Sequence, residues 1–285
     1  MLIYRGRLAP SPTGYLHLGH ARTFWVAHQR ARALGALIFR NEDLDRQRCR
    51  PQFVEAMFRD LRWLGLTWDE GPDIGGAFGP YSQSERRTFY VDAWRKLRDG
   101  GFIYPCSCSR KDLERALEAP HEGDDEPLYP GTCRSRINEA KDWHAPAGVS
   151  WRLRVPDNEV ISFEDRYFGS QRFTAGHDFS DFLIWRRDDV PAYQLAVTVD
   201  DAAMEITEVV RGADLLKSAA RQILLFRALG REPPQYFHCP LLRDETNVRL
   251  AKRHDSLSLR ALREQGTKPE RLLEKFAREI EPLSF

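Results

Sequence analysis

The sequence predicts an α/β fold in which a parallel-sheet domain is interrupted by a β-rich insertion. The first 40 residues contain a strand pattern, a Gly/Pro-rich loop, a helix pattern and a second strand pattern, which is the order of a βαβ unit. Alternating apolar and polar residues over 149–190 predict strands, and helix and strand patterns return over 191–242. The length of 285 residues allows one large domain or two modest ones.

The first half of the sheet domain has a signal for each of its elements. Residues 2–9 are strand-like and end at the turn-forming run 10–14. A helix is expected over about 18–34 because apolar residues recur on one face, and Gly35 would end it. The elements expected next are a strand at 36–40, helices at 51–64 and 85–97, and a strand at 102–104.

The insertion and the segments after it carry further patterns. Ser109 followed by Asp112 has the spacing of a capping box and predicts a helix start, and the acidic residues 121–126 predict a solvated loop. After the insertion we expect a strand at 206–212 and a helix at 215–229. The predicted units are therefore 1–104 and 191–242 as the halves of the sheet domain, 105–190 as the insertion, and 243–285 as a basic loop with a short C-terminal helical segment.

Composition excludes several classes of protein. The 43 Lys and Arg balance 42 Asp and Glu, and 42% hydrophobic residues favour a soluble globular chain over a disordered one. No run approaches the roughly 18 apolar residues of a membrane span. The N-terminus lacks the apolar stretch of a signal peptide, so we expect no membrane partner and a cytoplasmic location. Five Cys, an odd number in a reducing compartment, disfavour a disulfide framework.

The stretch RLAPSPTGYLHLGH, residues 7–20, lies where the first strand passes into the helix. Backbone N–H groups and the helix dipole favour a phosphate there. His17 and His20 can donate hydrogen bonds to phosphoryl oxygens, and Gly19 permits close approach of a base or a phosphate. The alternative interpretation of an isolated HLGH is a Pro-rich turn with incidental histidines. No G-x-x-x-x-G-K-[ST] or G-x-G-x-x-G motif competes with it.

Charged residues near predicted strand ends are candidate ligands. Glu42 and Asp43 follow the second strand, where parallel sheets bind ligands, and could pair with an ammonium group unless they are ordinary solvated acids. Arg211 is a candidate carboxylate binder at a later strand end. The run RLAKR, residues 249–253, is either a cationic loop over a leaving pyrophosphate or a basic surface turn.

Three cysteines are close enough in sequence to share a metal. Cys106, Cys108 and Cys133 supply three thiolates, one fewer than a closed tetrahedral zinc site needs. Three buried free cysteines are the alternative. The residues alone therefore leave the metal open.

Several of these motifs, in this order, resemble a known family. Residues 7–20 are similar to the first signature of class I aminoacyl-tRNA synthetases of the glutamyl/glutaminyl branch, where Arg-Phe-Ala-Pro-Ser-Pro-Thr-Gly precedes HIGH. RNED, residues 40–43, resembles the family's Arg-x-Glu-Asp element. RLAKR falls at the KMSKS loop, although it departs from the usual Lys-Leu-Ser-Lys at the first Lys and at the Ser.

A second resemblance distinguishes between branches of that family. The three cysteines, with Tyr129 four residues before Cys133, resemble the zinc element of the short glutamyl-queuosine tRNA(Asp) synthetase family. About 32 residues follow Arg253, where full glutamyl-tRNA synthetases carry a large anticodon-binding region. The resemblance therefore points to the short family and implies that an anticodon-binding domain is missing.

This resemblance implies a class I synthetase Rossmann-type nucleotide-binding domain with an inserted zinc-containing subdomain. It implies ATP-dependent, tRNA-independent activation of L-glutamate and its transfer to queuosine in the anticodon loop of tRNA(Asp). ATP with magnesium, L-glutamate and queuosine-containing tRNA(Asp) would be the substrates, one zinc would be structural, and the chain would act as a monomer.

The resemblance also assigns residues to roles. The implied catalytic residues are His17, His20 and Lys252, and Gly19 and Arg249 join them in binding ATP. The implied glutamate-binding residues are Arg7, Leu8, Ala9, Pro10, Ser11, Glu42, Tyr193 and Arg211. The implied zinc ligands are Cys106, Cys108, Tyr129 and Cys133, with His121 or a water as alternatives to the tyrosine.

Two other functions compete with this interpretation. The chain could be a truncated glutamyl-tRNA synthetase that charges the 3′ end of tRNA(Glu). It could also be an inactive paralogue that serves as an RNA-binding module. The altered RLAKR loop is the only support for the inactive paralogue, and the intact HLGH with Glu42, Tyr193 and Arg211 opposes it.

Overall fold

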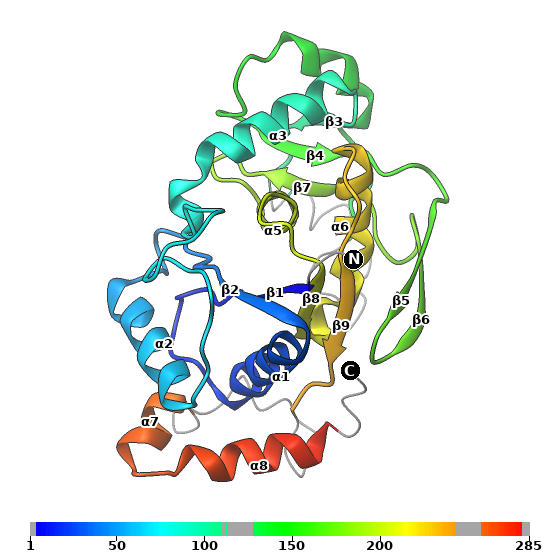
Figure 1. Ribbon diagram of the computed structural model, residues 1–285. Helices are drawn as coiled ribbons and strands as arrows, with labels where there is room; N and C mark the ends of the chain where they lie inside the picture. The colour runs from blue at the N-terminus through cyan, green and yellow to red at the C-terminus, as the bar shows by residue number, and fades with distance from the viewer. Residues whose placement is uncertain (1–3, 110–111, 113–127, 243–257, 281–285) are drawn as a thin grey trace.

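Parallel strands at the centre of the molecule carry the predicted βαβ unit (Figure 1). The computed structural model describes residues 4–109, 112, 128–242 and 258–280. Strand β1 (Tyr4–Leu8) pairs in parallel with β2 (Gly35–Phe39), and helix α1 (Leu18–Leu34) connects them, which confirms the prediction. Gly35 is required at this junction because a Cβ there would lie 2.2 Å from the Tyr4 carbonyl oxygen.

A second parallel pair lies beside the first and belongs to a separate four-stranded sheet, called the central sheet from here on. Strand β8 (Glu208–Gly212) pairs in parallel with β9 (Gln235–Cys239). The Thr207 backbone N–H donates to the Arg5 carbonyl at 2.9 Å, which joins β8 to β1. The carboxyl ends of these four strands therefore open at one edge of the sheet, where α1 begins (Figure 1).

The segment 105–190 contributes strands to two different sheets. Strands β3 (Ile103–Cys106), β4 (Ser150–Leu153) and β7 (Phe182–Trp185) form an antiparallel sheet in the order β3-β4-β7. Strands β5 (Val160–Asp165) and β6 (Gly169–Thr174) form a hairpin that adds to the central sheet through a parallel pairing of β5 with β9. The β-rich character predicted for 149–190 is confirmed, and the hairpin continues the central sheet beyond β9.

Helices cover the sheets and connect their strands. The helices are α2 (Pro51–Trp63), α3 (Arg87–Asp99), α5 (Tyr193–Ala203), α6 (Leu216–Ala228), α7 (Leu259–Glu264) and α8 (Pro269–Glu279). The 3-10 turns are η1 (Gln83–Glu85), η2 (Arg134–Asp142) and η3 (Ala213–Leu215). Helices α7 and α8 lie across the end of the molecule beside α2 and α1 (Figure 1). Within the described residues, no helix combines the length and the apolar character that crossing a membrane requires.

Three tryptophans, one each from α3, β4 and β7, lie in the same hydrophobic core. Trp94, Trp151 and Trp185 are fully buried, and the rings of Trp94 and Trp151 meet edge to face with centroids 5.0 Å apart. Buried aromatic rings of this size each remove a large apolar area from water.

The capping box is also formed, because Ser109 N–H and Oγ both reach the Asp112 carboxylate at 2.7 Å. The acidic run 121–126 lies outside the described residues.

Candidate active site

A cavity of about 400 Å³ opens at the carboxyl ends of β1, β8 and β9, against the first turn of α1. This is the edge at which open parallel sheets bind ligands. The predicted residues that line it are Arg7, Ala9, Pro10, Ser11, His17, Gly19, His20, Glu42, Tyr193 and Arg211. Leu8 is instead fully buried in the core, and Arg249 and Lys252 lie outside the described residues.

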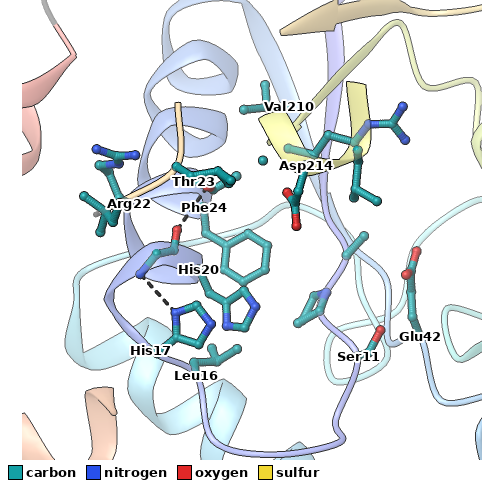
Figure 2. A pocket seen from close by; sticks show the side chains of 18 of the residues that line it. Ser11, Leu16, His17, His20, Arg22, Thr23, Phe24, Glu42, Val210 and Asp214 are labelled. Carbon is teal, nitrogen blue, oxygen red and sulfur yellow. Dashed lines mark hydrogen bonds between the residues drawn. The ribbon is translucent and has the colours of Figure 1, made fainter. Parts of the chain in front are cut away.

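The two histidines stand together at the start of α1. Their rings stack with centroids 3.7 Å apart, and Figure 2 shows them across the cavity from Glu42. His17 is the N-cap of the helix, and its Nδ1 accepts a hydrogen bond from the Gly19 backbone N–H at 3.1 Å. Because Nδ1 accepts, the neutral His17 ring carries its proton on Nε2. The cap therefore leaves His17 with a ring N–H of the kind that can donate to a phosphate.

Gly19 also leaves space for the ring of His17. A Cβ at Gly19 would lie 3.1 Å from the His17 Cε1 atom, closer than side chains normally pack. Any other residue at this position would therefore press on the His17 ring. The glycine therefore leaves room for the imidazole, and its role in the approach of a ligand stays a prediction.

Glu42 presents a buried carboxylate to the cavity. Arg40 donates to Glu42 Oε1 from Nη2 at 2.9 Å and from Nε at 3.3 Å. Burial raises the pKa of Glu42, although the attraction of Arg40 and Arg7 opposes the rise. Asp43, the other acid of the motif, accepts hydrogen bonds from Ser84 at 2.8 and 2.7 Å and does not line the cavity. Only one of the two acids is therefore placed to meet an ammonium group.

Two buried arginines border the cavity, and each has one nitrogen that makes no hydrogen bond to the described residues. Arg7 and Arg211 are each 4% exposed. Among the described residues, Arg7 Nε and Arg211 Nη2 have no hydrogen-bond partner, although Arg7 Nε lies 3.6 Å from Asp201 Oδ1 in an ion pair. A buried guanidinium N–H without an acceptor is costly, which indicates that an anionic ligand supplies one. Sequence reasoning identified both arginines, but only the structure shows that they face one cavity.

A second cavity of about 650 Å³ adjoins the first. The two share Ser11, Glu42, Tyr193 and Asp214 in their linings. Four basic side chains (Arg48, Arg186, Lys217 and Arg221) and three acidic ones (Glu42, Asp45 and Asp214) line the second cavity. Cationic side chains around an open cleft favour a polyanionic partner. Neither this cavity nor its basic border had been assigned from the sequence, because the four residues come from three separate segments.

The three cysteines meet Tyr129 beside the end of β3. Cys108 Sγ lies 3.6 Å from Cys133 Sγ, and the Tyr129 hydroxyl lies 3.6 Å from the sulfurs of Cys106 and Cys108. A tetrahedral zinc site has edges of about 3.8 Å between sulfurs and about 3.5 Å between sulfur and oxygen. These contacts therefore fit the edges of a Cys3Tyr tetrahedron. His121 lies outside the described residues.

The pKa values of the groups in this cluster are shifted in opposite directions. Burial would raise the pKa of the Cys133 thiol, but hydrogen bonds from Tyr129 and the Ser107 backbone N–H lower it to about 6. Burial raises the pKa of Cys108 to about 11 and also raises that of Tyr129. The Tyr129 oxygen accepts from the Cys133 backbone N–H at 2.8 Å, which favours negative charge on that oxygen.

The chain matches a known catalytic domain over most of its length. The family described as "tRNA synthetases class I (E and Q), catalytic domain" matches residues 4–280. The chain belongs to this family of class I tRNA synthetases. The predicted class I synthetase catalytic fold is therefore confirmed.

The chain is similar over nearly its whole length to glutamyl-Q tRNA(Asp) synthetases. It is 52% identical over 268 residues to the glutamyl-Q tRNA(Asp) synthetase of Nitratidesulfovibrio vulgaris, covering 92% of this chain and 82% of that one. It is 51% identical over 269 residues to the glutamyl-Q tRNA(Asp) synthetase of Symbiobacterium thermophilum, covering 93% and 83%. The predicted membership of the glutamyl-queuosine tRNA(Asp) synthetase family is confirmed by these similarities.

A solved structure of another synthetase shows the same architecture. The crystal structure of a glutamate tRNA ligase from Elizabethkingia meningosepticum, in complex with its amino acid, superimposes with a TM-score of 0.77 at 28% identity. The superposition covers 97% of this chain and 60% of that one.

Proposed function

We propose that this synthetase activates L-glutamate with ATP, without tRNA, and transfers it to the queuosine base in the anticodon loop of tRNA(Asp). The observation that carries the proposal is the high identity to two glutamyl-Q tRNA(Asp) synthetases over more than four fifths of their length. Three arginines and two carboxylates line the first cavity, and Arg7, Arg211 and Glu42 among them support glutamate as the amino acid because they can pair with its carboxylate and its ammonium group.

The side-chain carboxylate of glutamate lies between Arg7 and Arg211 in this proposal, and its ammonium group meets Glu42. Arg211 Nη2, and Arg7 Nε beside its ion pair with Asp201, then gain a hydrogen-bond acceptor. Glutamine would offer a neutral amide to two buried cations, so it is rejected by charge. Ser11 and Tyr193 complete the cavity around the substrate.

Activation needs charge stabilisation more than a protein nucleophile. The α-carboxylate of glutamate attacks the α-phosphorus of ATP in line, forming a carboxyl–phosphate anhydride and releasing pyrophosphate. His17 Nε2–H and His20 donate to the phosphoryl oxygens on which charge develops. Magnesium supplied with ATP neutralises further phosphate charge. Arg249 and Lys252, which lie outside the described residues, are proposed to hold the leaving pyrophosphate.

In the second step, glutamate is transferred to the modified nucleoside at the second cavity. A hydroxyl of the cyclopentene-diol attacks the anhydride carbonyl, the new ester C–O bond forms, and the bond to AMP breaks. The hydroxyl proton leaves with the AMP phosphate or with solvent. The basic border of the second cavity suits the phosphates that flank the modified nucleoside.

The cysteine cluster is proposed to bind one structural zinc through Cys106, Cys108, Cys133 and Tyr129. The sulfur and oxygen contacts support this ligand set. Bound zinc would tie β3 to the segment before η2 and supplies no step of the reaction. The monomeric state and the cytoplasmic location remain predictions from the sequence.

ATP–pyrophosphate exchange tests the activation step. Exchange should require glutamate, proceed without tRNA and be absent with glutamine or aspartate. A folded sample that shows no glutamate-dependent exchange would contradict the proposal.

Charging assays test the acceptor. Radiolabelled glutamate should attach to tRNA(Asp) that carries queuosine, and not to unmodified tRNA(Asp) or to tRNA(Glu). The label should remain alkali-labile and survive removal of the 3′ adenosine. Label lost with that adenosine would instead identify a synthetase that charges the 3′ end.

A further inference from the structure

Three buried polar side chains from adjacent strands are joined by hydrogen bonds behind the first cavity, which is called the glutamate cavity from here on. We propose that Asp165 and His238 are positioning residues that hold the Arg211 guanidinium for the substrate carboxylate. The inference rests on the proposed function, because it assumes that Arg211 binds glutamate. Neither residue belongs to any motif that the sequence suggested, and neither lines the cavity.

The three residues form a line across the central sheet. Asp165 ends β5, His238 lies in β9 and Arg211 lies in β8, in the strand order β5-β9-β8 (Figure 1). His238 Nδ1 is 2.6 Å from Asp165 Oδ2, and Arg211 Nε donates to His238 Nε2 at 3.0 Å. Asp165 is 2% exposed, His238 0% and Arg211 4%, so water does not compete for these bonds.

The neighbours determine the protonation of His238. The Arg211 Nε–H can only donate, so His238 Nε2 must be unprotonated to accept from it. Asp165 as a carboxylate can only accept, so His238 Nδ1 must carry the proton. The imidazole is therefore the neutral Nδ1–H tautomer. Asp165 fixes the hydrogen bond of Nδ1, and Arg211 fixes that of Nε2.

Asp165 is itself held firmly by the backbone. Its Oδ1 accepts from the backbone N–H groups of Tyr167 at 3.0 Å and Phe168 at 2.9 Å. These two residues form the turn of the β5–β6 hairpin. The acid that orients His238 is therefore part of a structured turn, which is the kind of support that keeps a binding group in place before the ligand arrives.

The remaining contacts of Arg211 leave one nitrogen for the ligand. Nη1 donates to Gln222 Oε1 at 2.8 Å, and the Tyr236 ring lies 5.3 Å from the guanidinium carbon. With Nε on His238 and Nη1 on Gln222, only Nη2 lacks a partner among the described residues. Two of the three nitrogens are thus used to aim the third, and Arg211 lines the cavity.

An Asp–His pair often acts as a general base, and the geometry excludes that role here. Both ring nitrogens of His238 are engaged within the protein, and the ring has no exposed surface. A general base must reach the proton that it removes. His238 therefore acts through Arg211 and does not touch the substrate.

Two substitutions at His238 distinguish the contributions of the two ring nitrogens. In His238→Gln the side-chain oxygen reaches the Nε2 position and can still accept from Arg211. In His238→Asn the shorter amide reaches only the Nδ1 position, so Arg211 Nε loses its acceptor. His28→Asn is the matched control, because His28 is also buried, at 8% exposure, and contacts Thr67 rather than the cavity.

The measurements are KM for glutamate and for ATP in pyrophosphate exchange, together with glutamate binding by calorimetry. His238→Asn should raise the KM and the Kd for glutamate at least about 10-fold, the loss typical of a hydrogen bond to a charged group. KM for ATP should not change. His238→Gln should stay within about 3-fold of the wild type, and His28→Asn should match it.

Asp165→Asn provides a second route if the histidine variants fold poorly. The neutral amide oxygen accepts from His238 Nδ1–H more weakly than the carboxylate does, so the imidazole is held less firmly and glutamate binding should weaken in the same direction. Equal effects of His238→Asn and His238→Gln, or equal changes in KM for glutamate and ATP, would overturn the positioning role. A wild-type chain that binds no glutamate would instead overturn the proposed function itself.

Discussion

Arg40 Nη1 and Asp201 Oδ1 are 2.6 Å apart, and the two side chains are 0% and 1% exposed. Each member of the pair also contacts a residue that lines the glutamate cavity. Arg40 also donates to Glu42, and Asp201 lies 3.6 Å from Arg7 Nε. The carboxylate proposed for the ammonium group and an arginine proposed for the side chain are therefore fixed to one buried ion pair.

Breaking this pair should destabilise the whole domain. In Asp201→Asn, Arg40 keeps Glu42 and the more distant Asp200, at 3.8 Å, but loses its shortest ion pair. Removing one partner of a buried pair typically costs about 3–5 kcal/mol in the free energy of unfolding. Urea unfolding of Asp201→Asn and the wild type at pH 7 measures this loss. Asp92→Asn, which breaks the exposed pair with Arg95, is the control and should change little. Equal losses in the two variants would contradict the prediction.

Glu42→Gln should weaken glutamate binding and remove its dependence on pH. The neutral amide cannot pair with the ammonium group, so KM for glutamate should rise about 10- to 100-fold while KM for ATP is unchanged. In the wild type, burial holds the pKa of Glu42 above 4.5 against the opposing charges of Arg40 and Arg7, while Asp201 adds to the rise. Ionised Glu42 is the form that binds, so affinity should fall as the pH decreases through that raised pKa. KM for glutamate from pH 5 to 8 tests this, and a variant that keeps the acid-side loss would show that another group titrates.

Local sequence predicts the part of the site that is built from contiguous residues. HLGH places His17 and His20 on one helix turn, and the strand–loop–helix order places that turn at the sheet edge. The same reasoning located Glu42, because it follows directly from β2. In each case the chemistry and its position are encoded within a few residues.

The support of Arg211 could not be predicted in this way. Asp165 and His238 are 73 residues apart and meet only because β5 pairs with β9. The alternating pattern predicted that 149–190 would form strands, but it carried no information about which sheet each strand would join. Pairing between distant strands depends on tertiary packing, which local propensity does not specify.

His17→Asn separates the role of His17 as a helix cap from its proposed role in catalysis. Asparagine is a strong N-cap and can accept from the Gly19 N–H in place of Nδ1, so thermal stability should be close to that of the wild type. It has no group at the Nε2 position, so kcat for exchange should fall about 100-fold, as when one transition-state donor is lost. His17→Ala removes both functions and should also lower stability by about 1 kcal/mol. An asparagine variant with the wild-type rate would assign His17 to capping alone.

Tyr129→Phe tests whether the phenol oxygen completes the metal site. The substitution keeps three thiols and the buried ring but removes the oxygen that lies 3.6 Å from Cys106 and Cys108. It also leaves the Cys133 backbone N–H without its acceptor. We expect the wild-type chain to bind one zinc and the variant to bind it at least about 10-fold more weakly, as when groups around a metal are lost.

Cobalt gives a direct readout of the geometry. Cobalt(II) bound to the wild type should show the intense visible bands of a four-coordinate site with thiolate ligands, and Tyr129→Phe should shift or weaken them. Tyr167→Phe, an exposed tyrosine at the hairpin turn, is the matched control and should leave both the spectrum and the zinc content unchanged. If Tyr129→Phe and the wild type gave the same spectrum and affinity, the fourth ligand would have to be a group other than the phenol, because the three cysteines supply only three of the four positions of the tetrahedron.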